Sequence, residues 1–221
     1  MIEKFAWYRN SEQGNKFMIV GGGGSTREFR DEIILKCIIE KYTTIGINRV
    51  IIQPDYHLWT NNQRLNDHKD CITDHSTLML GQNITPELRN MFHNYIDIHY
   101  TKSDSYYGYR NGQIYGTYRT AGILAIMIAH LMGAAKIDIV GMDGFTLHNK
   151  MDLHLGKKSQ HCYGSGYTDD ATWLQCIEKD KLVYNQLRSL ANIGIKFSIL
   201  TPTVFEDFRS PRCSQINGIT T

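Results

Sequence analysis

Short apolar segments alternate along the chain with longer segments in which apolar residues recur at helical spacing. The short segments are rich in β-branched residues, which is typical of buried strands. A chain in which such strands alternate with helices favours a parallel sheet with helices on its faces. The pattern therefore predicts an α/β fold with a mostly parallel, Rossmann-like sheet and helices on both faces. The predicted strands cover residues 16–20, 43–50, 55–62, 136–145 and 195–200.

Two helices are predicted around these strands from the spacing of apolar residues. The first covers residues 27–42, directly after the first strand and a run of four glycines. The second covers residues 120–135 and is apolar on every side, so we expect it to be buried. Thr120 is a suitable N-cap for this helix, and Gly133 marks its C-terminal end.

Polar, weakly periodic segments interrupt the pattern in two places. Residues 63–118 are rich in His and Tyr, and we expect loops here, with one strand near 95–100 and a small lid-like insertion. A second polar loop, residues 146–169, is expected on the face of the domain that carries the active site. It leads into a last helix that begins at Asp169 or Asp170 and ends at Gly194.

Six tyrosines lie between Tyr100 and Tyr118. They fit two interpretations: a structured surface loop whose rings pack on the domain, or a wall that stacks on the sugar or base of an acceptor. The whole chain, residues 1–221, is expected to form a single nucleotide-binding domain that contains these two loops.

The composition is that of an ordinary globular protein, with 42% hydrophobic and 21% charged residues. A chain of 221 residues is long enough to bury a core without disulfides or metals. Its 24 Lys and Arg against 22 Asp and Glu give a net charge of only +2. This balance argues against a chain built to coat nucleic acid or an anionic membrane, although a local basic patch remains compatible with it.

The five cysteines are widely spaced and include no CxxC pair, which favours a reduced, cytoplasmic protein without a zinc ribbon or a disulfide framework. The first ten residues lack the apolar region of a secretory signal. The most apolar segment, residues 121–135, is too short for a membrane span and contains His130.

Polar and glycine residues follow four of the predicted strands, and in a parallel sheet such strand ends meet at one edge. The run Gly21–Gly24 leads into Ser25. Glycines at this point let backbone N–H groups approach a phosphate, which a helix N-terminus also favours. The alternative is a tight turn that needs positive φ angles. The run is not a P-loop, since no Gly-Lys-Ser/Thr follows it.

The other strand ends supply amides, a hydroxyl and a carboxylate. Asn48 and Asn61 can hydrogen-bond a ribose or a base edge, but each also fits a simple turn. Thr120 opens the buried helix, either as a cap alone or as part of an anion site. Asp143 can accept a hydrogen bond from a substrate, hold a cation or fix the loop. Among nine histidines, His161 in a turn-rich segment is the preferred general base.

The ordered segments "IVGGGGS", "TIGINR", "HLWTNN", "TAGILAIMIAHLMGAAKIDIVGMDGF", "GSGYTDD" and "IKFSILTP" resemble the bacterial sialyltransferases of glycosyltransferase family 42. They are also similar to related Rossmann-like domains of unknown function, which include a pterin diphosphokinase branch. The resemblance covers most of the chain outside residues 63–117. It implies a metal-independent nucleotide-sugar transferase with a single Rossmann-like domain and a small lid.

The resemblance also implies roles for individual residues. Three positions depart from the family pattern: Gly22 replaces an asparagine, Phe145 replaces a tyrosine, and Ser165 stands where the family has its catalytic histidine. The expected catalytic residues are His161, Asp143 and Ser165. The expected nucleotide contacts are Gly21, Gly22, Gly23, Ser25, Asn48, Asn61, Thr120, Ala121, Gly122, Gly141, Phe145 and Tyr163.

Three functions remain open from the sequence. The first is an inverting glycosyltransferase that needs no cofactor beyond its CMP- or UDP-linked donor. The second is a diphosphokinase in which Asp143 holds Mg²⁺ and the glycines hold ATP. The third is a catalytically inactive nucleotide-binding domain. The acceptor (a glycan, a lipid-linked glycan, a protein or modified nucleic acid), peripheral membrane association and homo-oligomer formation are all left open.

Overall fold

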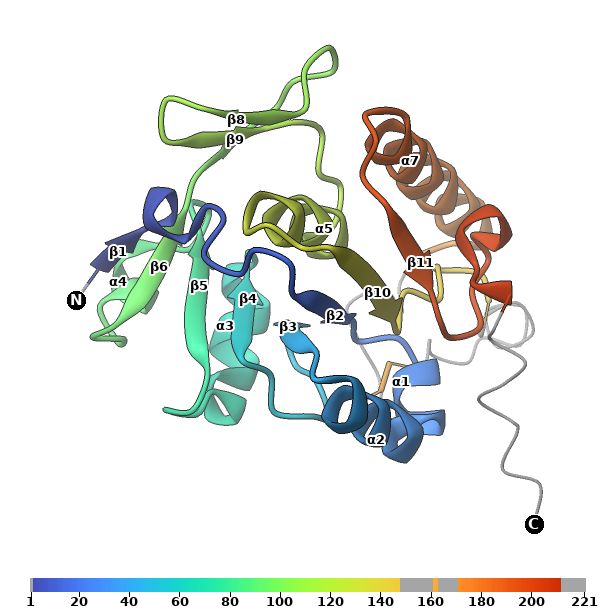
Figure 1. The fold of residues 1–221 in the computed structure, drawn as a ribbon, viewed down its shortest axis with the longest axis horizontal. Helices are drawn as coiled ribbons and strands as arrows, with labels where there is room; N and C mark the ends of the chain where they lie inside the picture. Colours follow the sequence, from blue (N-terminus) through green and yellow to red (C-terminus); the bar gives the residue numbers. More distant parts are fainter. Residues whose placement is uncertain (1, 148–160, 163–170, 212–221) are drawn as a thin grey trace.

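Eight parallel strands form one continuous sheet in the computed structural model, which describes residues 2–147, 161–162 and 171–211 (Figure 1). From β2 the chain builds outwards through β3, β4, β5 and β6, then returns to place β10 and β11 on the other side of β2. In spatial order the strands are β1 (Ile2–Lys4), β6 (Tyr95–Ile98), β5 (Thr77–Gly81), β4 (Tyr56–Trp59), β3 (Thr43–Ile47), β2 (Lys16–Val20), β10 (Lys136–Val140) and β11 (Phe197–Ile199).

The connections after β2 and β10 run in opposite directions, although the two strands are neighbours in exact register from Lys16 opposite Lys136 to Val20 opposite Val140. Such a reversal is a topological switch point, and its loops diverge to leave a crevice outside the carboxyl ends of the strands. In this fold the crevice therefore lies directly after Val20 and Val140.

Helices cover both faces of the sheet, as the sequence predicts (Figure 1). On one face, side chains such as Ile19 and Ile139 pack with α5 and with Leu187. On the other face, neighbouring strand residues such as Met18 pack with Ile33. The helices are α1 (Ser25–Glu28), α2 (Arg30–Glu40), α3 (Asn62–His68), α4 (Pro86–Arg89), α5 (Ala121–Leu131) and α7 (Trp173–Asn192), with 3-10 turns at Phe5–Tyr8, Lys69–Cys71 and Glu206–Phe208.

The apolar helix α5 is buried along most of its length, as expected. The Thr120 hydroxyl caps it by accepting a hydrogen bond from the N–H of Ile123 at 3.4 Å. Gly133 follows its C-terminus with φ of +99°, a left-handed conformation that favours glycine. No helix among the described residues is both long and apolar enough to span a bilayer.

The expectation of loops over 63–118 is wrong for the helices α3 and α4. It is also wrong for residues 77–81, which belong to the main sheet. These residues form β5, where Leu78 and Leu80 pack on one face and Met79 on the other. The expected strand near 95–100 is present as β6. The separate small sheet is confined to β7 (Tyr100–Thr101), β8 (Gly108–Arg110) and β9 (Gln113–Tyr115), in the order β7-β9-β8.

Several element boundaries also differ from the expectation, and the strands predicted over 43–50 and 136–145 end earlier, at Ile47 and Val140. The helix predicted over 27–42 is interrupted at Phe29, whose ψ of 28° is not helical, and so divides into α1 and α2. The strand predicted over 55–62 ends at Trp59, because Asn61 already caps α3. Helix α7 is capped by Thr172 in a capping box with Gln175, whereas Asp169 and Asp170 lie outside the described residues.

Candidate functional site

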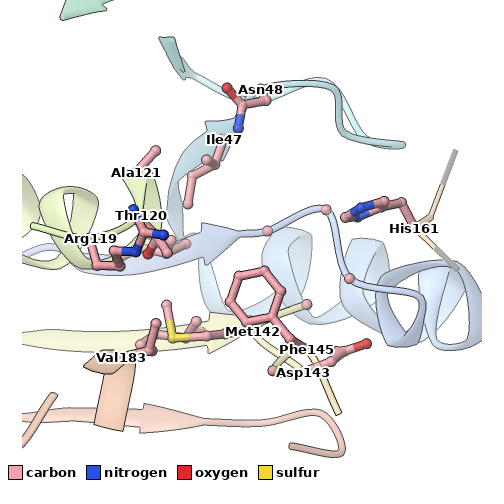
Figure 2. Close-up of a pocket in the computed structure, with 18 of the residues that line it drawn as sticks. Ile47, Asn48, Arg119, Thr120, Ala121, Met142, Asp143, Phe145, His161 and Val183 are labelled. Atoms are coloured by element: carbon pink, nitrogen blue, oxygen red, sulfur yellow. The ribbon is translucent and has the colours of Figure 1, made fainter. Parts of the chain in front are cut away.

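A cavity of about 380 Å³ lies at the carboxyl ends of β2, β3, β4 and β10, at the topological switch point. Figure 2 shows Asn48 on one side of it, Met142 and Phe145 on the opposite side, and His161 at one end. The structure thus brings together residues from distant strand ends. Its predicted members are Gly21, Gly22, Gly23, Asn48, Asn61, Thr120, Ala121, Gly122, Gly141, Asp143, Phe145 and His161.

At two positions of the run only glycine fits, because residues of the loop after β10 pack closely against them. A Cβ on Gly21 would lie 2.4 Å from the carbonyl oxygen of Gly141, and a Cβ on Gly23 would lie 2.5 Å from Cγ of Asp143. None of the four glycines has a positive φ, so the tight-turn interpretation is wrong in that respect. The glycines allow the end of β2 to lie against the end of β10.

Asp143 occupies the N-terminus of α1. Its carboxylate is buried and accepts hydrogen bonds from the Ser25 N–H at 2.9 Å and from the Ser25 hydroxyl. The next two N–H groups, of Thr26 and Arg27, donate to the carbonyls of Gly23 and Gly24. The Asp143 carboxylate thus occupies the start of α1, where the sequence suggested a phosphate. Ser25 itself is buried behind the cavity wall.

The N-terminus of α5 faces the cavity instead. Thr120, Ala121 and Gly122 line the wall, and Gly122 lies so close to Met142 that a Cβ would be 2.8 Å from Cε. Helix α5 has eleven residues, so its N-terminus carries the partial positive charge of a full macrodipole. The N-terminus of α5 can therefore stabilise an anion in the cavity.

Asn48 is held in an unusual conformation at the end of β3. Its φ is +53°, its N–H donates to Leu58, and its carbonyl oxygen accepts a hydrogen bond from Nε2 of His57. Burial lowers the pKa of His57, so the neutral ring with its proton on Nε2 makes this bond. The amide oxygen of Asn48 is buried and has no hydrogen-bond partner among the described residues. A group so placed can accept a hydrogen bond from a ligand.

Asn61 serves as the N-cap of α3. Its amide oxygen accepts a hydrogen bond from the N–H of Arg64 at 2.9 Å. Capping thus accounts for the position of Asn61 after β4, a role that neither interpretation from the sequence, a ligand contact or a simple turn, included. The amide nitrogen and the second lone pair of the oxygen remain to contact a ligand in the cavity that Asn61 lines.

The loop after β10 is fixed by Asp180 of α7, a residue that the sequence interpretation missed. The Asp180 carboxylate accepts hydrogen bonds from Phe145 N at 2.7 Å, Thr146 N at 3.1 Å and the Thr146 hydroxyl at 2.7 Å. Burial raises the pKa of Asp180, and these hydrogen bonds oppose the shift. Gly144 turns the loop with φ of +89°. Phe145 is thereby held against the cavity.

His161 is attached through its backbone to the glycine loop. Its carbonyl accepts a hydrogen bond from Nη2 of Arg27 at 2.7 Å, and the N–H of Cys162 donates to the Gly22 carbonyl at 3.0 Å. Burial raises the pKa of Cys162 to about 12, so this thiol stays protonated at neutral pH. The predicted site residues Tyr163 and Ser165 lie outside the described residues.

Among the described residues, three cationic side chains line the cavity, and none was singled out from the sequence: Arg64, Arg119 and Lys179. Asp143 supplies the one carboxylate among the described residues of this wall, and it is already bonded to Ser25. Arg119 could have been predicted as a cavity residue, because it directly precedes the predicted site residue Thr120. Lys179 lies within α7, and no local sequence pattern identifies it as a residue of the cavity. The wall as a whole favours an anion.

The tyrosines between Tyr100 and Tyr118 do not line the cavity in the part of the chain that is described. They pack on one another and on the core, with Tyr107 and Tyr118 edge to face at 6.1 Å between ring centroids. This arrangement favours the interpretation as a structured surface segment.

Within the described ranges, no group of three or more His, Cys, Asp or Glu residues is positioned to hold a metal ion. The chain matches no protein-family model, and no curated protein matches it significantly. The chain is thus a Rossmann-like parallel α/β protein with a cationic cavity at the switch point of its sheet.

Proposed function

We propose that the chain is a glycosyltransferase that transfers a sugar from a nucleotide donor to an acceptor hydroxyl. The observation that carries the proposal is the cationic cavity at the switch point, where open α/β sheets bind nucleotides. Its volume of about 380 Å³ lies in the range of small-molecule sites. Arg119, Lys179 and the N-terminus of α5 would bind the phosphate of the nucleotide.

His161 at the end of the cavity supplies a group for proton transfer. In the proposed reaction the acceptor oxygen attacks the anomeric carbon while the His161 imidazole takes the hydroxyl proton. The bond between the anomeric carbon and the phosphate oxygen breaks, and its electron pair leaves with the nucleotide. The cationic wall stabilises the negative charge that develops on that phosphate.

Sugar transfer is favoured over a diphosphokinase reaction by the environment of Asp143. A diphosphokinase would need this carboxylate as a ligand for Mg²⁺, but its oxygens accept hydrogen bonds from Ser25 and it is buried. The resemblance to family 42 transferases agrees with the proposed reaction. We therefore expect transfer to continue in EDTA.

A thermal-shift series with CMP, UDP, UDP-sugars and ATP plus Mg²⁺ tests the donor. A rise in Tm with a nucleotide or nucleotide sugar in EDTA supports the proposal, because ligands that bind the folded state raise Tm. A rise in Tm with ATP and Mg²⁺ alone would instead support the diphosphokinase reaction.

His161→Ala then tests the chemistry. We expect loss of sugar transfer with unchanged nucleotide affinity, whereas His130→Ala, at the far end of α5 from Thr120, should leave both unchanged. Unchanged turnover in His161→Ala would exclude this residue as the base. Nucleotide binding without turnover across a donor panel would instead indicate an inactive binding domain.

A further inference from the structure

Gln186 is a buried polar residue on the inner face of α7. It is 7% exposed, and its neighbours on that face, Val183, Leu187 and Leu190, are apolar and pack in the core. A buried amide costs free energy unless it is hydrogen-bonded. The amide oxygen of Gln186 accepts a hydrogen bond from the backbone N–H of Arg119 at 2.8 Å. The contact with Arg119, and not the packing of α7, therefore explains a glutamine at this position.

The hydrogen bond acts on a part of the chain that secondary structure does not hold. Arg119 lies between the small sheet and α5 and belongs to no strand or helix. The next residue, Thr120, is the N-cap of α5. Gln186 thus fixes the backbone at the point where the chain enters α5, next to the helix N-terminus that faces the cavity.

The side chain of Arg119 is available to a ligand. It lines the cavity, at the end away from His161 (Figure 2). Within the described part of the chain, its guanidinium forms no ion pair and no hydrogen bond. A guanidinium presents a rigid fork of N–H donors that matches the oxygens of a phosphate, so its use depends on where the backbone places it.

Helix α7 also carries a second cation of the same cavity, Lys179. Lys179 and Gln186 are seven positions apart, which is about two helical turns and places them on the same face of α7. One rigid helix therefore sets the positions of two cations: Lys179 directly, and Arg119 through the hydrogen bond to Gln186.

We propose that Gln186 is a positioning residue that holds Arg119 where its guanidinium binds the phosphate of the nucleotide. The inference rests on the proposed function, because it requires a nucleotide in this cavity. Gln186 is not among the described residues that line the cavity, so it acts through Arg119. Loss of its acceptor oxygen should leave the charge of Arg119 unchanged but displace it from the phosphate.

The variant Gln186→Met tests this role, because methionine keeps the length of the side chain and the net charge but accepts no comparable hydrogen bond. The probe is whichever of CMP and UDP raises the Tm of the unaltered protein more. Isothermal titration in EDTA should show an affinity about tenfold lower than that of the unaltered protein. The salt dependence of the affinity should also decrease, as in Arg119→Met, because a cation no longer lies beside the phosphate.

Leu190→Val is the control for damage to α7. It shortens a fully buried side chain on the same face of the helix, so it should lower Tm. Since Leu190 does not contact Arg119 through a hydrogen bond, the affinity and its salt dependence should stay unchanged. An equal loss of affinity in Leu190→Val and Gln186→Met would mean that only the stability of α7 matters, and would overturn the inference.

A double-mutant cycle shows whether Gln186 acts through Arg119. When Arg119→Met is already present, adding Gln186→Met should change the affinity by less than about twofold. Equal losses in both backgrounds, or an unaltered affinity in Gln186→Met alone, would overturn the inference and leave the proposed function intact. Binding of neither CMP nor UDP would overturn both. Coupled binding without sugar transfer would support the inference and count against the transferase.

Discussion

Ser25 donates both its backbone N–H and its hydroxyl to the carboxylate of Asp143, which lies 118 positions later in the chain. The contact joins the start of α1 to the end of β10 across the switch point of the sheet. It also explains why residue 23 is a glycine, because a side chain there would fill the space in which the Asp143 carboxylate lies. One buried polar contact thus fixes the loop that forms one wall of the cavity.

Gly23→Ala should destabilise the protein by about 1–3 kcal/mol, because its Cβ would lie 2.5–2.7 Å from the Asp143 carboxylate and force the loops apart. Urea unfolding measures the loss. Gly24→Ala is the matched control, because Gly24 has helical dihedrals (φ −58°, ψ −33°) that alanine adopts readily. Equal stability of the two variants would show that the carboxylate can move away without cost.

The strand ends that make up the site were visible in the sequence because the sheet is parallel. Gly21, Asn48 and Thr120 each stand at the boundary of a strongly apolar segment. Periodicity alone therefore placed them at one edge of the sheet, where the structure brings them to a single cavity. The α/β fold with helices on both faces is confirmed for the same reason.

The roles of those residues depend on contacts that periodicity does not encode. The glycine run suggested a phosphate cradle. In the structure, Gly23 instead faces Asp143, which follows a strand more than a hundred residues later in the chain. Lys179 reaches the cavity only because α7 packs beside α5, and no local pattern marks it. Residues 77–81 were expected to be loop because polar residues flank this short strand on both sides.

Asp180→Ala should destabilise the protein by about 2–4 kcal/mol. The substitution leaves three donors of Phe145 and Thr146 without their acceptor, in a partly buried loop. Asp180→Asn keeps one acceptor oxygen, so its loss should be smaller. Chemical denaturation of both variants is the measurement, with Glu178→Ala on the exposed face of α7 as the control. A loss no larger than that of the control would contradict the proposed clamp.

Lys179→Met should weaken the binding of a nucleotide by about tenfold, which corresponds to about 1.4 kcal/mol. The ammonium group of Lys179 lies 5.3 Å from the centre of the Phe145 ring, at the edge of the cavity. Its loss removes a positive charge from the wall while a side chain of similar length is kept. Isothermal titration at low salt measures the change.

Lys181→Met is the control for that experiment. Lys181 is exposed on the same helix and does not line the cavity, so its loss removes the same net charge without touching the wall. Equal weakening by both variants would mean that only the overall charge of the protein matters. A change confined to Lys179→Met would identify a local contact.

His57→Gln should reduce the dependence of stability on pH. Burial lowers the pKa of His57 in the folded protein, whereas the unfolded chain binds a proton at a pKa of about 6.5. Below that value the unfolded state takes up a proton that the folded state does not, so stability falls as pH falls. The slope from this residue cannot exceed about 1.4 kcal/mol per pH unit.

Glutamine supplies an N–H donor for the Asn48 carbonyl but does not titrate. The variant should therefore lose less stability than the unaltered protein between pH 7.5 and pH 5.5, as measured by urea unfolding at both values. At pH 7.5 its nucleotide affinity should fall by less than that of His57→Phe, because phenylalanine fills the space without donating to Asn48. An unchanged pH slope in His57→Gln would mean that the pKa of His57 is the same in the folded and unfolded states. Equal affinities for the two variants would mean that the His57 hydrogen bond does not position Asn48.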